Sequence, residues 1–568
     1  MLARHLVPVA LVALAAVLAP ARAETPRDEL LRYLPADVGF CLVVQDLRGR
    51  LGELTESPFA ERWRRSVLGK ELLASREWKQ LRDLTAALEK HLGVGWKQFR
   101  DDILGDAVVL AFRPGPPGKP EEDQELLLVR AGNPRLLARL VARLNEVQRA
   151  SGELTELEER EHRGVSYVRR VENRATSYYL LRGPVLLFTS KEPLLRLAID
   201  AERGEPAAGG FAARFRALGI ARAPVALLVN PRAFDEAIAA RAAADPGSRP
   251  IALLWKGLQG FGLAVDTDAD LRLTAAVRVR LADLPPAARR FFPKAADASA
   301  LWATVPADAL LAVGGRTSPA AWYELIGELL SPDGRRRFER ELARSIGAML
   351  GRDVVRDVLP AVGPDWIAYL TAPTESSKSL LPSLTAAIRL ARGSEDDPLD
   401  ATIVQAIHSF AQLGVLAHNK AHPDRPLTVR TTTRGGIRIR SLVGAEVFPP
   451  GVEPSFALKG GFLVVGSTPA AVVGLRVPTE TPPVGAGAPL LRASVTELRA
   501  YLQAHRDRLT EAMTRQNRLT AEQAGARLAA VLAGLELVDR LELRQHTADG
   551  LLSFVLTVRP AAPLRKAP

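Results

Sequence analysis

The stretch Leu34-Pro-Ala-Asp37, followed by the apolar run at residues 38–44, recurs in the middle of the chain as Val305-Pro-Ala-Asp308, followed by residues 309–313. The two copies are displaced by 271 positions (306 minus 35). Each reads as a turn that leads into a buried strand, because Pro and Asp favour turns and a short apolar run favours a strand. An internal repeat at this distance decides the fold prediction, since it makes the two halves of the chain copies of one unit.

Further matches follow in the same order in both halves, at displacements between 265 and 279. They are Gly164-Val165-Ser166-Tyr167 with Gly436-Ile437-Arg438-Ile439, Ala223-Pro224 with Ala488-Pro489, Gly257 with Gly534, and Ala269-Asp270 with Ala548-Asp549. Several matches at similar displacements are harder to attribute to chance than a single tripeptide. We therefore predict a tandem duplication.

The junction of the two copies is expected where Pro285, Pro286 and Pro293 interrupt the pattern. We predict a first repeat at residues 24–284, a linker at 285–300 and a second repeat at 301–568. Within the first repeat, apolar runs at residues 107–112 and 125–130 flank a proline-rich turn, and three short runs follow between residues 165 and 189. Such spacing is typical of antiparallel hairpins. The expected class is α+β, with two tandem copies of a unit in which helices cover one face of an antiparallel sheet.

The N-terminus has the features of a secretory signal peptide at residues 1–23. A short basic start at Arg4 and His5 precedes an apolar stretch at 6–18, and Ala21-Arg22-Ala23 offers small residues for cleavage. The apolar stretch is shorter than the roughly 20 residues that span a bilayer. We therefore expect a secreted or periplasmic protein with no transmembrane segment in the mature chain.

The signal peptide, the openings Leu34-Pro-Ala-Asp37 and Val305-Pro-Ala-Asp308, and the repeated α+β half together resemble a family of exported bacterial proteins of unknown function. The resemblance extends over nearly the whole mature chain. It implies the duplicated architecture, and it brings no activity and no catalytic residues.

The chain of 568 residues has a net charge of +12, which raises the question of a polyanionic partner. Cations and acids are intermixed, however, as in Glu156-Leu157-Glu158-Glu159-Arg160-Glu161, and the densest basic run is only Arg335-Arg336-Arg337. A nucleic-acid surface concentrates Lys and Arg on one face. Nucleic acid is therefore not expected, and the partner is taken to be an envelope protein, a glycan or a lipid.

We nominate no catalytic, cofactor-binding or metal-binding residue, and no cofactor. The single cysteine, Cys41, lies in a predicted buried strand. His418 and His422 have the spacing of a zinc pair, but they lack an intervening Glu and lie beside prolines, which favours a solvated loop. The acidic pairs Asp101-Asp102 and Asp396-Asp397 are interpreted as helix-capping groups.

Two further groups of residues receive a structural interpretation. Gly257, Gly260 and Gly262 are expected to relieve crowding where a helix meets a sheet, because their spacing does not match a nucleotide-binding loop. The seven tryptophans are widely separated in the sequence, so we interpret them as core residues and not as a sugar platform.

Three functions remain open at this point. The first is a non-enzymatic binding or scaffolding protein of the cell envelope, which the absence of a recognisable catalytic motif favours. The second is an extracytoplasmic hydrolase whose site is scattered through the sequence. The third is a carrier of lipids or other hydrophobic ligands, which would use a cleft between sheet and helices.

Export can be tested directly. We expect the protein recovered from the envelope fraction or the medium to begin at Glu24, because Ala21 and Ala23 stand at the cleavage positions. Sequencing of the mature N-terminus measures this. A protein that keeps Met1 to Ala23 would contradict the prediction.

Overall fold

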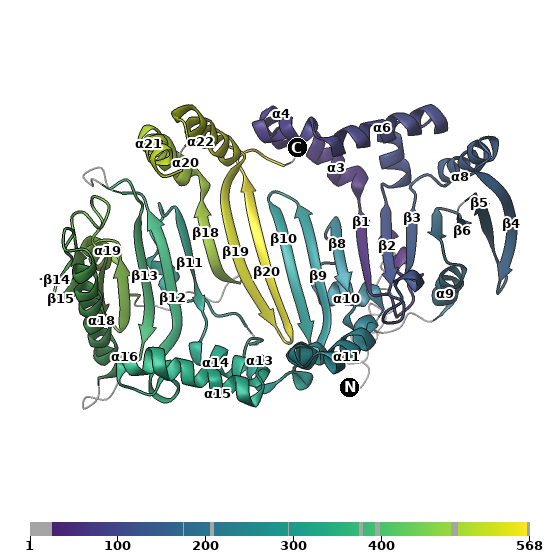
Figure 1. Cartoon of the computed structure of the whole chain (residues 1–568). Coiled ribbons are helices and arrows are strands. Elements are labelled where there is room, and N and C mark those ends of the chain that lie inside the picture. The colour runs from purple at the N-terminus through teal and green to yellow at the C-terminus, as the bar shows by residue number, and fades with distance from the viewer. Residues whose placement is uncertain are drawn as a thin grey trace, which may run out of the picture. The chain divides into compact units, whose positions relative to one another are not determined.

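The structure is a computed structural model, and it describes residues 25–173, 175–204, 210–293, 295–373, 379–391, 398–478, 487–517 and 519–564. The predicted signal peptide at residues 1–23 lies outside this part. The fold is α+β and its paired strands are antiparallel, as predicted (Figure 1). The chain divides into two compact units, of which unit 1 comprises Met1–Arg48, Ala86–Gly115 and Glu121–Arg214, and unit 2 comprises Gly49–Thr85, Pro116–Pro120 and Phe215–Pro568.

The sheet of unit 1 has the strand order β1-β2-β3-β7-β6-β5-β4. Its strands are β1 (Phe40–Gln45), β2 (Ala107–Arg113), β3 (Gln124–Arg130), β4 (Leu154–His162), β5 (Val165–Glu172), β6 (Thr176–Arg182) and β7 (Val185–Thr189). The β2–β3 hairpin and the β5–β6–β7 meander confirm the prediction. Strand β4 was not predicted.

The sheet of unit 2 has the order β14-β15-β16-β17-β13-β12-β11-β18-β19-β20-β10-β9-β8. Its strands are β8 (Val225–Val229), β9 (Leu258–Thr267), β10 (Leu271–Val279), β11 (Leu311–Arg316), β12 (Val362–Thr371), β13 (Ser383–Leu390), β14 (Thr428–Arg434), β15 (Ile437–Val443), β16 (Ser455–Lys459), β17 (Phe462–Gly466), β18 (Ala488–Ser494), β19 (Val538–Ala548) and β20 (Leu551–Pro560).

One strand order occurs twice in the chain. The order β1-β2-β3-β7-β6-β5-β4 of unit 1 is followed again by β11-β12-β13-β17-β16-β15-β14 in unit 2. The meander β8-β9-β10 likewise has a counterpart in β18-β19-β20, and the two meanders are joined through β10 and β20. This pairing places residues 225–279 in unit 2, so the division between the compact units does not fall at residues 285–300.

The first part of the predicted linker at residues 285–300 is helical. It forms α13 (Pro286–Arg289), whose Ala287 and Ala288 are buried. Ala288 belongs to a small core with Val279 and Leu284. Proline and alanine at this position therefore build a short packed helix, in addition to interrupting the strand pattern.

Helices pack on both faces of each sheet, which corrects the expectation of one covered face. In unit 1, α8 (Pro134–Ala150) packs on Val129, while α9 (Glu192–Arg203) lies against β3, β6 and β7. In unit 2, α18 (Leu399–Ala421) packs on Phe456, while α19 (Pro469–Gly474) packs on Ala457. Consecutive strand residues point to opposite faces, so Phe456 and Ala457 mark the two sides of one sheet.

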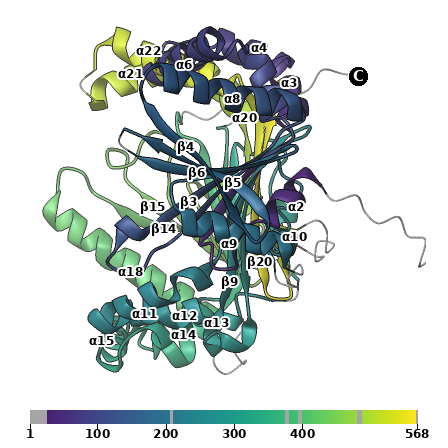
Figure 2. The same ribbon diagram turned by 90° about the vertical axis from the view of Figure 1, so that its right-hand side faces the viewer.

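The remaining helices join these layers or lie at the ends of the strands. In unit 2, α20 to α22 lie at one end of the strands and α13 to α15 at the other (Figures 1 and 2). Their bounds are α2 (Pro26–Leu31), α3 (Leu47–Thr55), α4 (Pro58–Arg65), α5 (Val67–Leu73), α6 (Arg76–Leu92), α7 (Trp96–Gln98), α10 (Phe211–Ala217), α11 (Asp235–Ala244), α12 (Arg249–Gly257), α14 (Pro319–Leu329), α15 (Pro332–Leu342), α16 (Ala348–Leu350), α17 (Leu359–Ala361), α20 (Val495–Ala504), α21 (Arg506–Asn517) and α22 (Ala521–Leu535).

Among the residues that the structure describes, no helix has both the length and the hydropathy that crossing a bilayer would require.

The predicted role of the glycines is confirmed at two positions. A Cβ atom on Gly257 would lie 2.5 Å from Leu284 Cδ2, and a Cβ atom on Gly262 would lie 2.6 Å from Ile220 Cδ1. Both distances are far below van der Waals contact, so these positions admit only a hydrogen atom. At Gly260 the nearest atom would be 3.6 Å away, which is ordinary contact.

This difference gives a matched pair of variants on strand β9. Gly262→Ala should lower the free energy of unfolding by about 1–3 kcal/mol, because Ile220 is buried and has little room to move. Gly260→Ala should change it by less than about 1 kcal/mol, since the added methyl group fits and the unfolded chain loses entropy. Urea denaturation of both variants measures the effect, and equal losses would contradict the packing argument.

Candidate functional site

One face of the sheet in unit 2 carries apolar side chains that are only half-buried. Ten strands each contribute one residue to a continuous row of directly paired positions, and Leu273 and Val465 are the most exposed of them. Adjacent strands lie about 4.8 Å apart, so the row extends over about 40 Å. We call it the apolar row, and it consists of Val225, Val265, Leu273, Leu556, Leu543, Leu491, Val313, Ala368, Ala386 and Val465.

A cavity of about 970 Å³ opens on this face, between the sheet and helices α12 to α14. Its floor is formed by strand residues on the same side as the apolar row, because Val277 lies four positions from Leu273 and Phe554 two positions from Leu556. Its walls come from α12, α13 and α14. These helices and the residues that flank them supply apolar lining side chains, including Leu254, Leu258, Leu284, Ala288, Phe292, Ala321 and Leu325.

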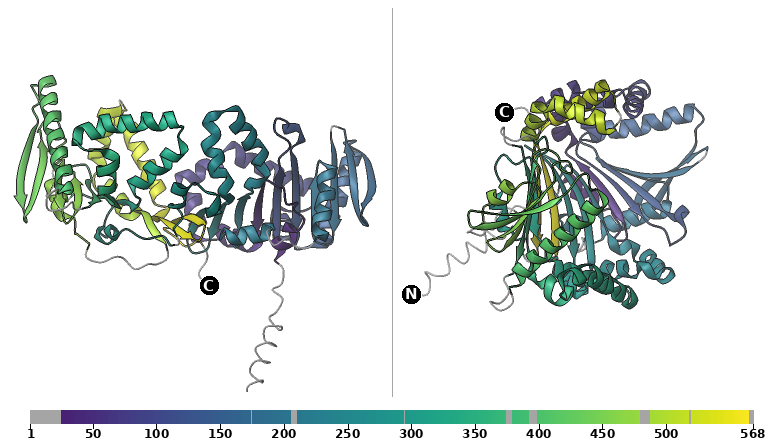
Figure 3. Two further views of the ribbon diagram at one scale, coloured as in Figure 1. Left: turned by 90° about the horizontal axis from the view of Figure 1, so that it is seen from below. Right: turned by 60° about the vertical axis from the view of Figure 1, so that its left-hand side comes forward.

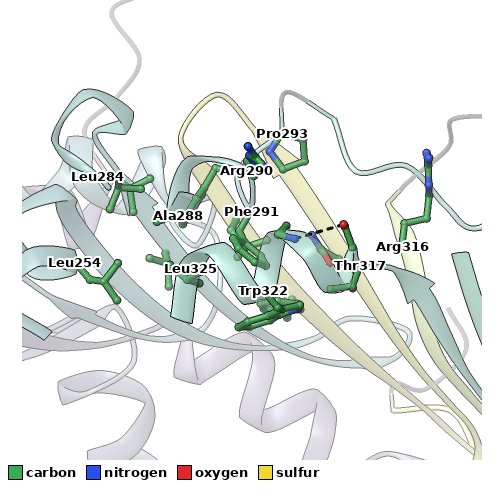
Figure 4. A pocket seen from close by; sticks show the side chains of 18 of the residues that line it. Leu254, Leu284, Ala288, Arg290, Phe291, Pro293, Arg316, Thr317, Trp322 and Leu325 are labelled. Carbon is green, nitrogen blue, oxygen red and sulfur yellow. Dashed lines mark hydrogen bonds between the residues drawn. The ribbon is translucent and has the colours of Figure 1, made fainter. Parts of the chain in front are cut away.

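An aromatic pair stands at the wall of the cavity. The rings of Phe291 and Trp322 meet edge to face, with centroids 4.7 Å apart. Figure 4 shows Leu254, Leu284 and Leu325 on one side of this pair, and Arg316 on the other. Phe291 comes from the segment after α13 and Trp322 from the first turns of α14. The wall is therefore made by residues that were predicted to be a linker and by the second half of the chain.

The charged groups at the cavity are neutralised by neighbours. Arg290 forms an ion pair with Glu324 at 2.7 Å. Arg316 lies 3.1 Å from Asp297 and 3.4 Å from Asp365. Each guanidinium therefore already has a carboxylate partner, and the interior of the cavity offers mainly apolar contact. Such a lining can bind hydrocarbon.

A polar cluster of Tyr, Glu and Arg side chains lies in unit 1, between the sheet and α9. The Tyr167 hydroxyl donates to Glu192 Oε1 at 2.6 Å, and Glu192 also accepts from Arg196 at 2.6 Å and from Arg160 at 2.9 Å. Burial raises the pKa of the Glu192 carboxyl, but these three hydrogen bonds outweigh burial and hold the pKa below its ordinary value. A carboxylate that already accepts three hydrogen bonds is a poor proton acceptor. The role of the cluster is therefore to hold α9 against the sheet.

Unit 2 has a second cluster of the same residue types. The Tyr323 hydroxyl donates to Glu339 Oε1 at 2.7 Å, and Arg335 Nε donates to the same oxygen at 3.0 Å. These two hydrogen bonds hold the pKa of the Glu339 carboxyl below its ordinary value. This carboxylate is likewise committed to holding α14 and α15 together.

The structure places the residues that the sequence singled out in separate environments. Cys41 is fully buried in β1, as predicted, and burial raises the pKa of its thiol. Asp101 pairs with Arg100 at 2.6 Å, while Asp396 and Asp397 lie outside the described residues. In the described part of the chain, no three His, Cys, Asp or Glu side chains are grouped so that they could hold a metal ion.

The interpretation of the histidine pair as loop residues is wrong for His418. Helix α18 continues to Ala421, so His418 lies in its last turn and His422 directly follows the helix. The two rings are 4.9 Å apart, and His418 Nε2 lies 3.0 Å from the carbonyl oxygen of Arg425. The ring thus helps to close the helix end, where backbone groups lack helical partners.

The tryptophans were the functional signal that sequence reasoning missed. Trp255, Trp322 and Trp366 all line the one cavity, although 111 positions separate the first from the last (366 minus 255). Trp255 is oriented by a hydrogen bond from its Nε1 to Asp235 at 2.9 Å. Only the strand pairing of unit 2 brings them together, so composition and spacing could not have revealed this set.

Comparison with known proteins adds little. No family model matches the sequence, and no curated protein matches it. Among solved structures, crystal form III of TP0453 is similar to 44% of this chain and 79% of its own, at 12% sequence identity and a TM-score of 0.22. A likeness of this size carries no argument about fold or function.

The Glu192 cluster predicts a dependence of stability on pH. Because folding lowers the pKa of Glu192, its stabilisation is present above the unfolded pKa of about 4.3 and is lost as pH falls through the folded value. Glu192→Gln should lower the free energy of unfolding by about 1–3 kcal/mol at pH 7, and the difference from wild type should shrink at pH 3. Urea denaturation at both pH values measures it.

Glu156→Gln is the control, because Glu156 lies at the exposed edge of the sheet and pairs with Arg169 at 3.2 Å. That variant should differ little from wild type at either pH. If Glu192→Gln lowers the free energy of unfolding by the same amount at pH 7 and at pH 3, the ionised carboxylate is not what stabilises the fold.

Proposed function

We propose that this chain is a non-enzymatic binding protein whose ligand is an apolar molecule of the lipid class. The cavity between β10, β20 and α12 to α14 carries the proposal, because its lining is aliphatic and aromatic and its volume of about 970 Å³ suits a hydrocarbon chain. The half-exposed apolar row beside it offers further contact for a long ligand.

The carrier hypothesis is favoured over the hydrolase hypothesis by the chemistry of the lining. Arg290 and Arg316 have carboxylate partners, and the Tyr–Glu–Arg clusters of both units are closed ion-pair networks. The scaffold hypothesis accounts for an exposed apolar surface but not for a deep cavity. A binding protein for an apolar ligand accounts for both.

Export belongs to the proposal. A soluble protein that shields an apolar molecule is useful in a compartment between or outside membranes, and the features of residues 1–23 match a signal peptide. We therefore propose that the protein acts in the periplasm or the medium, with a lipid as its first expected partner.

Tandem duplication is also part of the proposal. The strand order of unit 1 is the same as that of β11 to β17, and the matched sequence positions are displaced by 265 to 279 residues. Under this proposal, the pairing of β10 with β20 joins the ends of the two copies. In that case the cavity lies where the two copies meet, since α13 follows the first copy and α14 belongs to the second.

The ligand proposal is tested with 1-N-phenylnaphthylamine, an uncharged apolar fluorophore. The wild-type protein should bind it saturably, and Leu325→Asp should weaken binding by at least about tenfold, because a carboxylate in the cavity loses its hydration without gaining a partner. Fluorescence titration measures this, and mass spectrometry of lipids that copurify with the protein identifies the natural ligand class.

Ile326→Asp is the matched control, since Ile326 is exposed on the same helix and does not line the cavity. It should bind the fluorophore within about twofold of wild type. If Leu325→Asp fails to fold, Trp322→Ala tests the exposed wall instead. Binding that no cavity variant changes would overturn the proposal.

A further inference from the structure

The solvent side of α18 carries apolar side chains where charged ones are the rule. Phe410, Leu413 and Leu416 are 60%, 64% and 68% exposed, which are the largest values among the described large hydrophobic residues. Their spacing of three residues keeps them on one side of the helix. Ile403 and Val404, nearer the start of α18, are buried on the sheet. Phe410 lies at the border of this buried side, seven residues after Ile403, whereas Leu413 and Leu416 face away from it.

Helix α8 occupies the equivalent place in unit 1, and it shows that a helix at this place does not need exposed apolar side chains. It follows β3 as α18 follows β13, and its solvent side carries Arg135, Arg139 and Arg143. Arg143 pairs with Glu146 at 3.1 Å, as on an ordinary hydrated helix. The apolar stripe on α18 is therefore a property of that helix and calls for a covering partner.

The segment that carries the stripe has an excess of positive charge. Residues 399–443, which form α18 and the β14–β15 hairpin, contain six Lys and Arg residues but only Asp400 and Asp424 as acids. Two of the six are in ion pairs, Arg425 with Asp424 and Arg430 with Glu453. Lys420 follows the stripe on α18, and Arg434 and Arg438 are exposed at the turn of the hairpin. Figure 3 shows α18 and this hairpin, both in green, side by side at one end of unit 2, and the two elements are in contact.

An apolar groove extends the stripe toward the sheet. It has a volume of about 420 Å³ and lies between α18 and strands β15 to β17. Phe410 and Val415 line it from the helix, and Leu442 and Val465 from the strands. Val465 is also the last member of the apolar row, so apolar surface continues from the stripe onto the open face of the sheet.

We infer that α18 and the β14–β15 hairpin dock on the surface of an anionic lipid bilayer. Such a surface combines acyl chains, which accept protruding Phe and Leu side chains, with phosphates, which attract Lys and Arg. A second copy of this face would bring like charges together and is disfavoured. The inference goes beyond the proposed function, since it concerns a surface separate from the cavity, and it assigns the place where a lipid could be exchanged.

The test is flotation of the purified protein with vesicles of phosphatidylcholine alone or of an equimolar mixture with phosphatidylglycerol. Wild type should bind the mixed vesicles and bind phosphatidylcholine more weakly. The triple variant Phe410→Ser, Leu413→Ser, Leu416→Ser should bind the mixed vesicles at least about tenfold more weakly. Val531→Ser, at a 52% exposed position on α22, is the control and should bind as wild type does.

A second triple variant tests the role of charge. It combines Lys420→Gln, Arg434→Gln and Arg438→Gln, and the loss of three positive charges should abolish the preference for phosphatidylglycerol. The matched control is Arg135→Gln, Arg139→Gln, Arg143→Gln on α8, which should retain it. Thermal denaturation confirms that each variant is folded. All variants share one N-terminus, so differences in binding arise from the substitutions.

Three results would overturn the inference. They are equal binding of wild type to both kinds of vesicle, unchanged binding by the serine variant, and a wild-type dimer that the serine variant converts to a monomer in sedimentation analysis. The last result would assign the face to a second copy. Leu325→Asp should leave vesicle binding unchanged, so that failure of the cavity proposal and failure of this inference can be told apart.

Discussion

The pairing of β10 with β20 is the interaction on which unit 2 depends. Eight consecutive residues, from Leu271 to Arg278, lie opposite partners on β20. These strands are far apart in sequence, and their register places Val277 beside Leu552 on the side that carries the cavity. A shift of register by one residue would turn both side chains to the opposite face, so register alone decides whether the cavity has an apolar floor.

The antiparallel strands of unit 1 were largely predictable because they alternate or are uniformly apolar. Strand β4 was missed since its sequence, LTELEEREH, is dominated by Glu, and its residues pair on one side with β5. Charges of this kind are usual at a sheet edge, where they discourage pairing with other chains. A charged strand resembles a polar loop in sequence, so only the structure could identify it.

The cavity was beyond sequence reasoning for a different reason. Its tryptophans come from α12, α14 and β12, and its remaining wall comes from residues interpreted as a linker. Local patterns report which face of an element is apolar, but they do not report which elements meet. The intermixing of cations and acids that the sequence displays has a structural counterpart, because arginines such as Arg130 and Arg160 take part in ion pairs with nearby carboxylates.

The burial of Cys41 gives the molecule an intrinsic reporter. It is the sole cysteine of the chain, it lies between paired residues of the β1–β2 ladder, and none of its surface is exposed. A thiol reagent can reach it only when that ladder opens, so the rate of alkylation measures the free energy of opening at one known place. Any change in how readily unit 1 opens would be visible as a change in the labelling rate, without any engineered probe.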